Sequence, residues 1–459
     1  MTSTIRALWP QLLPGTLRTF AKTPNWMGGA LVILLALAVI LSGAPSTVAA
    51  LTLEEFVALA RSREAGYQAA VAASAAERAA GWRDVADYGP RLQVSGSYHA
   101  SRDRISPAGH EPVAADQAAS FSESLLSVTA EQPIIDLERA GRLSRGLITM
   151  DLAVMQQRKA EEELVLSACE RYYTALSHRE GYRLARSETA ALRVLVQAAE
   201  KRLELGFGTI TDKHNAEARY RLSEASEISR LTELENALRA LEELIDAPVD
   251  RGHLEDKPDS NLFPLTEPLH YWQELALQNN TDLRISRLRQ TRTEAERRMA
   301  GGRFSPALML FASHRHYRPD NGLAGHGEDR RETDIGLRLE MDLLAGGSDL
   351  ASFSEASSRL RSAQAQVVAM ERAVRRTVHS LSESIAATAE LIEVYRNAVE
   401  SNRLALEATQ ASFHEGAKVL LDVLNAQQDY YRSRKAYQTT RYDYLLLREK
   451  LKLTVGIYE

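Results

Sequence analysis

The polar residues that could do chemistry gather in two matching stretches of the chain. One stretch, "FHEGAKVLLDVLNAQQDYY" (Phe413–Tyr431), contains Asp422 and Asn425, which are three residues apart and so share a helix face. A related stretch lies 210 residues earlier (422 − 212 = 210), where Asp212 and Asn215 occupy the corresponding positions. An aspartate near a helix start often accepts hydrogen bonds from free backbone N–H groups, so capping is one role open to both acids. Repetition of this kind indicates a duplicated chain and must be established before a fold is assigned.

Other residues suggest no catalysis. His314 and His316 alternate along one expected strand and could bind a metal ion, but no carboxylate or cysteine lies nearby at ligand spacing. A polar wall is therefore favoured over a metal site. The single cysteine, Cys169, is expected to be a small buried residue of a helix. The sequence has no phosphate-binding glycine loop, nucleophile elbow or paired acid–base set, so we expect no enzyme activity, no catalytic residue and no cofactor.

The composition favours long helices. The chain has 459 residues with only 14 prolines and 25 glycines, which is long enough for two or more units of ordinary domain size. Its formal net charge is −5. A chain with this charge offers no basic surface for nucleic acid.

Residues 1–50 are typical of a secretory signal peptide. A basic leader precedes the apolar run Ala30–Leu41, and small residues follow up to Ala50. This run is shorter than the roughly 20 residues that a helix needs to cross a bilayer, so cleavage after Ala50 is expected, with a retained membrane anchor as the alternative. Export without an internal disulfide or a lipidated cysteine indicates the periplasm or outer membrane of a bacterium with two membranes.

The rest of the chain divides into two repeats. Residues 51–250 form the first repeat and residues 268–459 the second, and a linker with several prolines spans residues 251–267. Each repeat opens with an amphipathic helix, expected at about 53–88 and about 269–301. A proline follows each of these helices, as expected where the backbone turns extended.

Hydrophobic alternation with a period of two then predicts a pair of strands in each repeat. The pattern is clearest in "IGLRLEMDL", where apolar and polar or charged side chains alternate. In the second strand the alternation slips between Leu125 and Leu126, which suggests a β-bulge or a misjudged strand edge. The four expected strands are about 92–102, 121–135, 307–317 and 333–344.

Long proline-free helices follow each pair of strands, at about 138–203 and about 348–414. Each reaches a glycine stretch, with Gly206 and Gly208 in the first repeat and Gly416 in the second, and a further helix comes after it. Glycine is the residue that most easily adopts the backbone turn that reverses a helix. At about 1.5 Å per residue the first long helix would extend roughly 100 Å, too far to bury its own apolar seam without neighbours.

The strands suit a membrane, but one chain has too few of them. Strands of about ten residues can cross a bilayer, and the smallest membrane barrels have about 8 strands. In lipid no sheet edge can stay unpaired, because each exposed backbone group costs several kcal/mol. A four-stranded chain that crosses a membrane must therefore share its barrel with copies of itself.

The order helix, hairpin, long helix, glycine turn and helix, present twice behind a signal peptide, resembles the TolC-type outer-membrane efflux and secretion channels. The resemblance covers almost the whole mature chain, and its motifs are "FHEGAKVLLDVLNAQQDYY", "GTITDKHNA", "QPIID" and "DLLAGG". It implies a mainly α fold with a small β part. In that fold a duplicated helix–β-hairpin–long helix–helix unit forms a trimeric α-helical barrel and a shared 12-stranded transmembrane β-barrel.

The resemblance also implies a function and partners. The function is the exit duct of a tripartite efflux or type I secretion system, which passively conducts substrate from an inner-membrane pump across the periplasm and outer membrane. The implied partners are two further copies in a homotrimer, a periplasmic adaptor (membrane fusion protein), an inner-membrane transporter and outer-membrane lipid. The implied location is the cell outer membrane, with the chain extending into the periplasm.

The same resemblance assigns roles to the polar residues of the two glycine stretches. In the resembling channels two acids ring the aperture and favour cations. This chain has Asp422 at the first position and Asn425 at the second, so we expect three charges in the trimer rather than six and weaker cation selectivity.

A latch between neighbouring coils is the second implied role. Lys418 matches the basic member of the family's latch, and Thr211 and Asp212 match its partners. Phe413 stands where an aromatic hydroxyl is expected, so that hydrogen bond is missing and the latch should be looser. Capping stays open as the alternative role for Asp212 and Asp422, and plain solvation for Lys418.

The main alternative function is a periplasmic coiled-coil adaptor or scaffold, which also contains long helical hairpins. Such a protein would need a β-rich lipoyl-like or barrel domain between its helices. It would have no use for two membrane-like hairpins at matching places of a duplicated chain.

Overall fold

The computed structural model describes residues 51–105, 117–252, 254–256, 267–320 and 328–457. All of them belong to one unit, Leu51–Glu459, and the expected signal peptide at residues 1–50 lies outside the described residues. Within the described ranges, no helix combines the length and apolar character that a membrane span requires.

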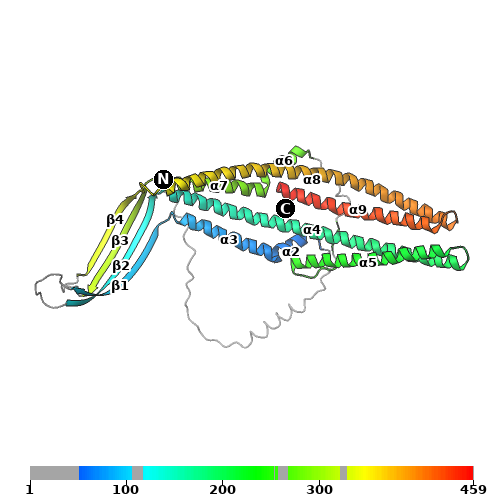
Figure 1. The fold of residues 1–459 in the computed structure, drawn as a ribbon, viewed down its shortest axis with the longest axis horizontal. Coiled ribbons are helices and arrows are strands. Elements are labelled where there is room, and N and C mark those ends of the chain that lie inside the picture. The colour runs from blue at the N-terminus through cyan, green and yellow to red at the C-terminus, as the bar shows by residue number, and fades with distance from the viewer. Residues whose placement is uncertain (1–50, 106–116, 253, 257–266, 321–327, 458–459) are drawn as a thin grey trace, which may run out of the picture. The chain divides into compact units, whose positions relative to one another are not determined.

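Two halves with the same order of elements make up this unit (Figure 1). The first half contains α2 (Leu53–Arg63), α3 (Ala65–Ala86), β1 (Arg91–Ile105), β2 (Gln117–Ile135), α4 (Leu137–Glu204) and α5 (Ile210–Ile245). The second half contains α6 (Leu269–Asn279), α7 (Thr281–Gly302), β3 (Ala307–Asp320), β4 (Arg330–Glu340), α8 (Ser348–His414) and α9 (Leu420–Val455). The predicted fold class, mainly helical with a small sheet and a duplicated unit, is confirmed.

The opening helix of each half is broken in two, where the sequence predicted one continuous helix. Glu64, between α2 and α3, has a ψ of 120°, and Asn280, between α6 and α7, has a ψ of 124°. The Glu64 carboxylate accepts hydrogen bonds from the N–H groups of Gly66 and Tyr67, and the Asn280 side chain accepts one from Leu283 at 2.9 Å. Each residue therefore caps the second helix segment, which compensates for the backbone hydrogen bonds lost at the break.

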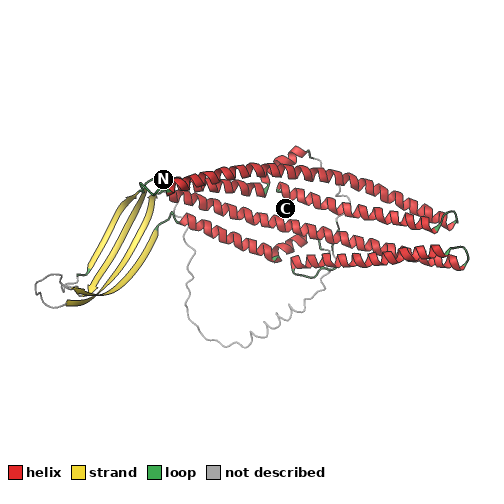
Figure 2. Ribbon diagram, in the orientation of Figure 1, coloured by secondary structure: helices red, strands yellow, loops and turns green. Residues whose placement is uncertain are grey.

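The four strands form one antiparallel sheet in the order β1-β2-β3-β4 (Figure 2). The pairing of β2 with β3 joins the two halves, and β1 and β4 are the edges. Of the two alternatives expected at Leu125 and Leu126, the bulge is absent, since both residues pair in regular register with β1, whereas the strand edge was misjudged, since β2 begins at Gln117 and not at about residue 121. The register against β3 shifts instead between Pro133 and Ile135, because proline has no N–H to donate to a ladder.

Helices α4 and α7 approach each other backbone to backbone next to the sheet. A Cβ atom on Gly302 would lie 2.4 Å from the backbone nitrogen of Glu138, and one on Gly141 would lie 2.7 Å from the Cα of Met299. Only glycine fits at such distances. This crossing fixes the place where the end of α7 and the start of α4 lead into the strands.

The main core lies farther along the helices. Tyr172 of α4 is 1% exposed and its ring centroid lies 5.9 Å from that of Phe56. Its hydroxyl lies 2.7 Å from the carbonyl oxygens of both Leu51 and Glu255, which ties α4 to the chain on either side of the first repeat. Cys169 is 2% exposed in the same cluster, which confirms the small buried residue that the sequence predicted.

Glu162 of α4 is a buried acid at the junction with α7. It is 7% exposed, and one carboxylate oxygen accepts a hydrogen bond of 2.5 Å from the hydroxyl of Thr281, the first residue of α7. Nε of Arg158 lies 3.6 Å from the same oxygen. Burial raises the pKa of Glu162 above its usual value, although Thr281, Lys159 and Arg158 favour the charged form.

Glu162→Gln is expected to stabilise the protein at neutral pH. Because the folded-state pKa is raised, the stability that this group contributes is full below the unfolded-state pKa and is lost as pH rises through the folded-state value. Glutamine keeps the acceptor for Thr281 and does not ionise. Between about pH 4.5 and pH 7 the Tm of the variant should therefore fall less than that of the wild type. The same change at Glu163, whose side chain is 67% exposed, is the control, and identical pH profiles for all three proteins would contradict the prediction.

Candidate functional site

The first part of the site is the pair of helix-reversing turns, which lie at the same end of the helices (Figure 1). Gly206 ends α4 with a φ of 78° and Gly416 ends α8 with a φ of 81°, conformations that favour glycine. Gly208 has a different role, since a Cβ there would lie 3.0 Å from the backbone nitrogen of Leu203. The two expected coil turns thus have the same backbone geometry.

Both acids that follow the turns are the third residues of their helices, and each accepts a hydrogen bond from the N–H of the N-cap residue, Thr209 or Val419. Asp212 accepts from the N–H of Thr209 at 3.3 Å, and its own N–H donates to Oγ1 of Thr209 at 3.1 Å. Asp422 accepts a longer hydrogen bond of 3.4 Å from the N–H of Val419, which has no hydroxyl to return it. Asp422 also lies 3.7 Å from Nζ of Lys418. The capping role considered for both residues is therefore present in the chain.

Phe413 connects the two hairpins through an arginine. Its side chain is 7% exposed, and the guanidinium carbon of Arg202 on α4 lies 4.3 Å from the ring centroid. The same guanidinium donates to the Phe413 carbonyl oxygen at 3.3 Å. The resemblance implies an aromatic hydroxyl at this position, which phenylalanine lacks. The ring instead makes a cation–π contact with Arg202.

Arg219 of α5 makes a second contact between the hairpins, which the sequence analysis missed. It donates from Nη2 to Oδ1 of Asn425 at 2.8 Å and from Nη1 to Oε1 of Gln428 at 2.5 Å. Both acceptors are on α9, so one side chain ties the two hairpins together beside the expected aperture residue. The spacing of residues along one helix cannot reveal a pair that lies 206 residues apart.

Glu188 of α4 adds an acid to this end of the molecule. Burial raises its pKa, and the positive charges of Arg219 and Lys435 act in the opposite direction. The surroundings of Arg219 thus combine two amides, one acid and a second cation.

The residues of the expected latch do not all meet. Among the described residues, no hydrogen bond or ion pair joins Lys418 to Thr211 or Asp212. The ion-pair partner of Lys418 is Asp422 on its own hairpin, and Thr211 is exposed. Arg202 and Arg219 instead make hydrogen bonds between the hairpins, beside an apolar cluster that both hairpins share.

The second part of the site is the sheet, whose two faces differ. Residues directly opposite each other in neighbouring strands share a face. The apolar face carries, among others, Leu92, Val94, Leu126, Val128, Leu310, Ile335, Leu337 and Leu339. Ile335, Leu337 and Leu339 are 77%, 65% and 69% exposed, so this face is uncovered within the chain.

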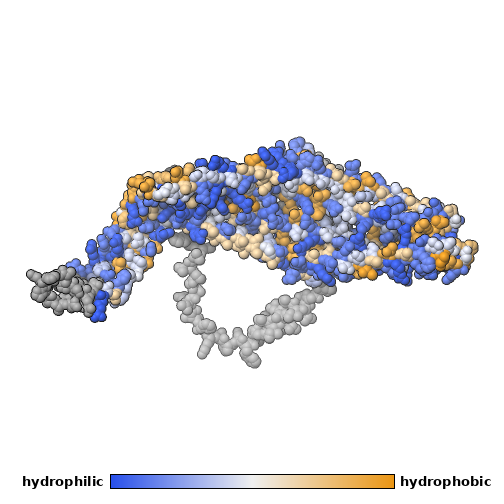
Figure 3. All heavy atoms as spheres, viewed as in Figure 1, coloured by the Kyte–Doolittle hydropathy of each residue, from blue (hydrophilic) through white to orange (hydrophobic). Residues whose placement is uncertain are grey.

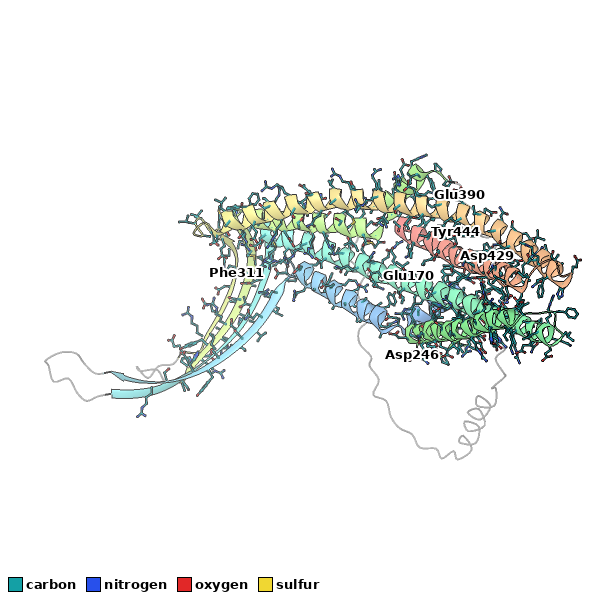
Figure 4. The ribbon with its side chains drawn as sticks, turned by 45° about the vertical axis from the view of Figure 1, so that its right-hand side comes forward. Glu170, Asp246, Phe311, Glu390, Asp429 and Tyr444 are labelled. Carbon is teal, nitrogen blue, oxygen red and sulfur yellow. The ribbon has the colours of Figure 1, made fainter. Side chains whose placement is uncertain are left out.

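The opposite face of the sheet is polar and crossed by ion pairs. Arg338 lies 3.5 Å from Glu131, and Arg315 lies 3.6 Å from Asp334. Phe311, labelled on β3 in Figure 4, lies on this face, with the guanidinium carbon of Arg338 4.9 Å from its ring centroid. A sheet with one lipid-compatible face and one hydrated face can separate a membrane from water.

The two histidines of β3 lie on the apolar face near polar partners. Nδ1 of His314 lies 2.8 Å from the hydroxyl of Thr333, and Nε2 of His316 lies 2.6 Å from Asp329. The sequence has no carboxylate at ligand spacing, but the fold brings Asp329, the residue before β4, next to His316. The polar wall favoured for the two histidines is instead part of the apolar face. The described residues still contain no group of three or more potential metal ligands.

Comparison with known proteins agrees with this arrangement. The chain matches the family described as "Outer membrane efflux protein" over residues 57–246 and 272–456, one segment in each half. The alkaline protease secretion protein AprF of Pseudomonas aeruginosa is 29% identical over 344 residues, which cover 74% of this chain and 71% of that protein. The outer membrane protein TolC of Vibrio cholerae is 26% identical over 369 residues, 80% of this chain and 82% of that protein.

Solved structures share the fold. The outer membrane protein VceC of Vibrio cholerae superposes with a TM-score of 0.74 at 18% identity, over 88% of this chain and 96% of that chain. The CmeC outer membrane channel of Campylobacter jejuni gives 0.72 at 14% identity, over 89% and 86%. With its two repeats, its helix-reversing turns and its two-faced sheet, the chain belongs to the outer membrane efflux protein family.

Proposed function

We propose that this protein is the exit duct of a tripartite efflux or type I secretion system in the outer membrane. The observation that carries the proposal is the four-stranded sheet, which has an exposed apolar face and two edge strands. An unpaired edge in lipid costs several kcal/mol for each free backbone group. Three copies supply 12 strands, which is enough to close a barrel, and their helices then surround one tunnel.

In this arrangement the helices extend into the periplasm and the turns at Gly206 and Gly416 form the periplasmic tip. A periplasmic adaptor would bind there, and an inner-membrane transporter would supply the energy, since a passive duct holds only a water-filled path. Opening is an outward movement of the two hairpins, and an adaptor that binds the open form more tightly shifts the equilibrium towards it.

The names of the relatives bear on the cargo class. The alkaline protease secretion protein of Pseudomonas aeruginosa and the proteases secretion protein PrtF of Dickeya chrysanthemi, 26% identical over 348 residues, are named for protein export. These names support a secreted polypeptide as cargo, whereas the family name supports efflux. Export of a reporter protease from cells with and without this gene decides between the two.

The adaptor or scaffold alternative fits less well. The connection between α4 and α5 is the short turn from residue 205 to residue 209, which leaves no room for a lipoyl-like domain at that place. Membrane fractionation of cells that express the full chain tests the proposal. Recovery in the outer-membrane fraction, as an oligomer that cross-links to a trimer, is expected, and recovery as a soluble monomer would refute the duct.

Lys418→Ala and Asp212→Ala are each expected to raise the conductance in planar bilayers by weakening a latch between coils of neighbouring protomers, because within one chain the described contacts do not join the two residues. The effect should be modest, because the ion pair of Lys418 with Asp422 lies within one hairpin and the Lys418 side chain is 54% exposed, so that little of this interaction bears on opening. Asp212→Asn is the control variant, because asparagine also caps helices but has no charge. Raised conductance in Asp212→Ala alone indicates loss of the cap, and unchanged conductance in all three variants counts against a latch here.

A further inference from the structure

The apolar face of the sheet ends in a basic cluster at the strand ends remote from the helices. We define the basic cluster as His316, Arg318 and Arg331, with Asp329 between them. Nε2 of His316 lies 2.6 Å from Asp329, and the nearest nitrogens of Arg318 and Arg331 lie 3.8 and 3.9 Å from it. One carboxylate faces two guanidinium groups and an imidazole, so the cluster has an excess of positive charge.

The strand register places the basic cluster on the apolar face. One row of directly opposed residues crosses all four strands and consists of Gly96, Leu126, His316 and Arg331. The next row outwards consists of Tyr98, Ser124 and Arg318. The arginines at 315 and 330 lie on the opposite, polar face.

A hollow of about 440 Å³ opens beside the cluster. Its lining includes Gly96, Tyr98, Leu126, His316 and Arg318. Nothing lies within 4 Å of the position that a Cβ would take on Gly96, and Leu126 and Tyr98 are 50% and 70% exposed. The lining also includes Ser97, Ser124 and Leu125, so the hollow combines apolar side chains and two serines with a basic rim, which suits an amphiphile with a negative headgroup.

The height of the cluster fits the edge of the apolar band. Leu308 and His316 are eight residues apart on β3, which is about 27 Å along the strand and about 20 Å across a bilayer at a usual strand tilt. The apolar band of membrane barrels is about 25 Å tall. Figure 3 shows the same change along the sheet, from apolar atoms where it joins the helices to hydrophilic atoms at its far end.

We propose that the basic cluster binds a phosphate group of a phosphorylated glycolipid in the outer leaflet, the lipid A part of lipopolysaccharide, with an acyl chain in the hollow over Gly96. This inference rests on the proposed function, which puts the strand ends remote from the helices at the cell surface. Two guanidinium forks suit phosphate oxygens, and Asp329 holds them in place. The exposed apolar rows below take the other acyl chains.

Native mass spectrometry of the purified full chain in detergent, titrated with bisphosphorylated lipid A, tests the site. The double variant Arg318→Gln/Arg331→Gln should bind lipid A at least about tenfold more weakly, because it loses two charge-assisted contacts. The matched control is Arg315→Gln/Arg330→Gln, which removes two arginines from the polar face of the same strands and should bind like the wild type.

Several outcomes would overturn the inference. Equal weakening in both double variants would indicate a general charge effect. Equal binding of dephosphorylated lipid A would show that the site does not recognise the phosphate group. Displacement by inorganic phosphate at an equal concentration would indicate a site for free phosphate. If the wild type conducts in bilayers but binds no lipid A, this inference alone fails. If the wild type does not conduct, the proposed function fails, and the lipid A inference that rests on it fails too.

Discussion

Replacing Gly302 by alanine is expected to destabilise the protein by about 3 kcal/mol, the upper part of the range for overpacked sites. The added Cβ would lie 2.4 Å from the nitrogen of Glu138 and 2.5 Å from the carbonyl carbon of Leu137, and both are backbone atoms that cannot rotate away. The start of α4 must therefore move away from α7, directly beside the strands. The expected result is a lower Tm of the purified protein and a lower yield in the outer membrane.

The neighbouring residue supplies the control. A Cβ on Gly301, in the same helix, would lie 3.5 Å from Phe353, which is an ordinary contact. Gly301→Ala should leave Tm and yield close to those of the wild type, and its lower backbone freedom in the unfolded chain favours the folded state slightly. If both variants melt at the same temperature, the close approach of α4 and α7 does not limit stability.

Arg219→Ala is expected to raise the open probability, and with it the time-averaged conductance in planar bilayers, by about tenfold or more, the largest functional effect that we predict. The change removes the hydrogen bonds from α5 to Asn425 and Gln428 on α9 in every protomer. If each protomer loses about 1 kcal/mol of closed-state stability, a trimer loses about 3 kcal/mol, which is a factor of about 100 in the opening equilibrium. The effect should exceed that of Lys418→Ala, whose ion pair stays within one hairpin.

Arg221→Ala is the matched control for this experiment. Arg221 lies on the same helix, its side chain is 76% exposed, and it pairs at 2.7 Å with Glu224 on its own helix. Its removal changes the charge by the same amount without touching α9. Conductance that rises equally in both variants would show that charge, and not the contact between the hairpins, controls opening.

Much of the fold was determined by local sequence. The glycine stretches ended the long helices at the predicted places, with α4 at Leu137–Glu204 and α8 at Ser348–His414. The alternation of apolar and polar side chains predicted the four strands, whose observed ends differ from the predicted ends by at most four residues. These features depend on backbone preferences and on the burial of one face of each element, and residues that are close in sequence determine both.

Only the tertiary structure decided the details that depend on distant partners. The breaks at Glu64 and Asn280 arise where a side chain caps a new helix start. Glutamate and asparagine also occur inside continuous helices, so the residue type alone does not predict a break. The register shift at Pro133 depends on a partner strand nearly 180 residues away (309 − 133 = 176). Arg219 meets Asn425, and Asp329 meets Arg318, because packing brings separate elements together. Helical and strand periods determine which face a residue occupies, whereas the partner on that face is determined by how the elements pack.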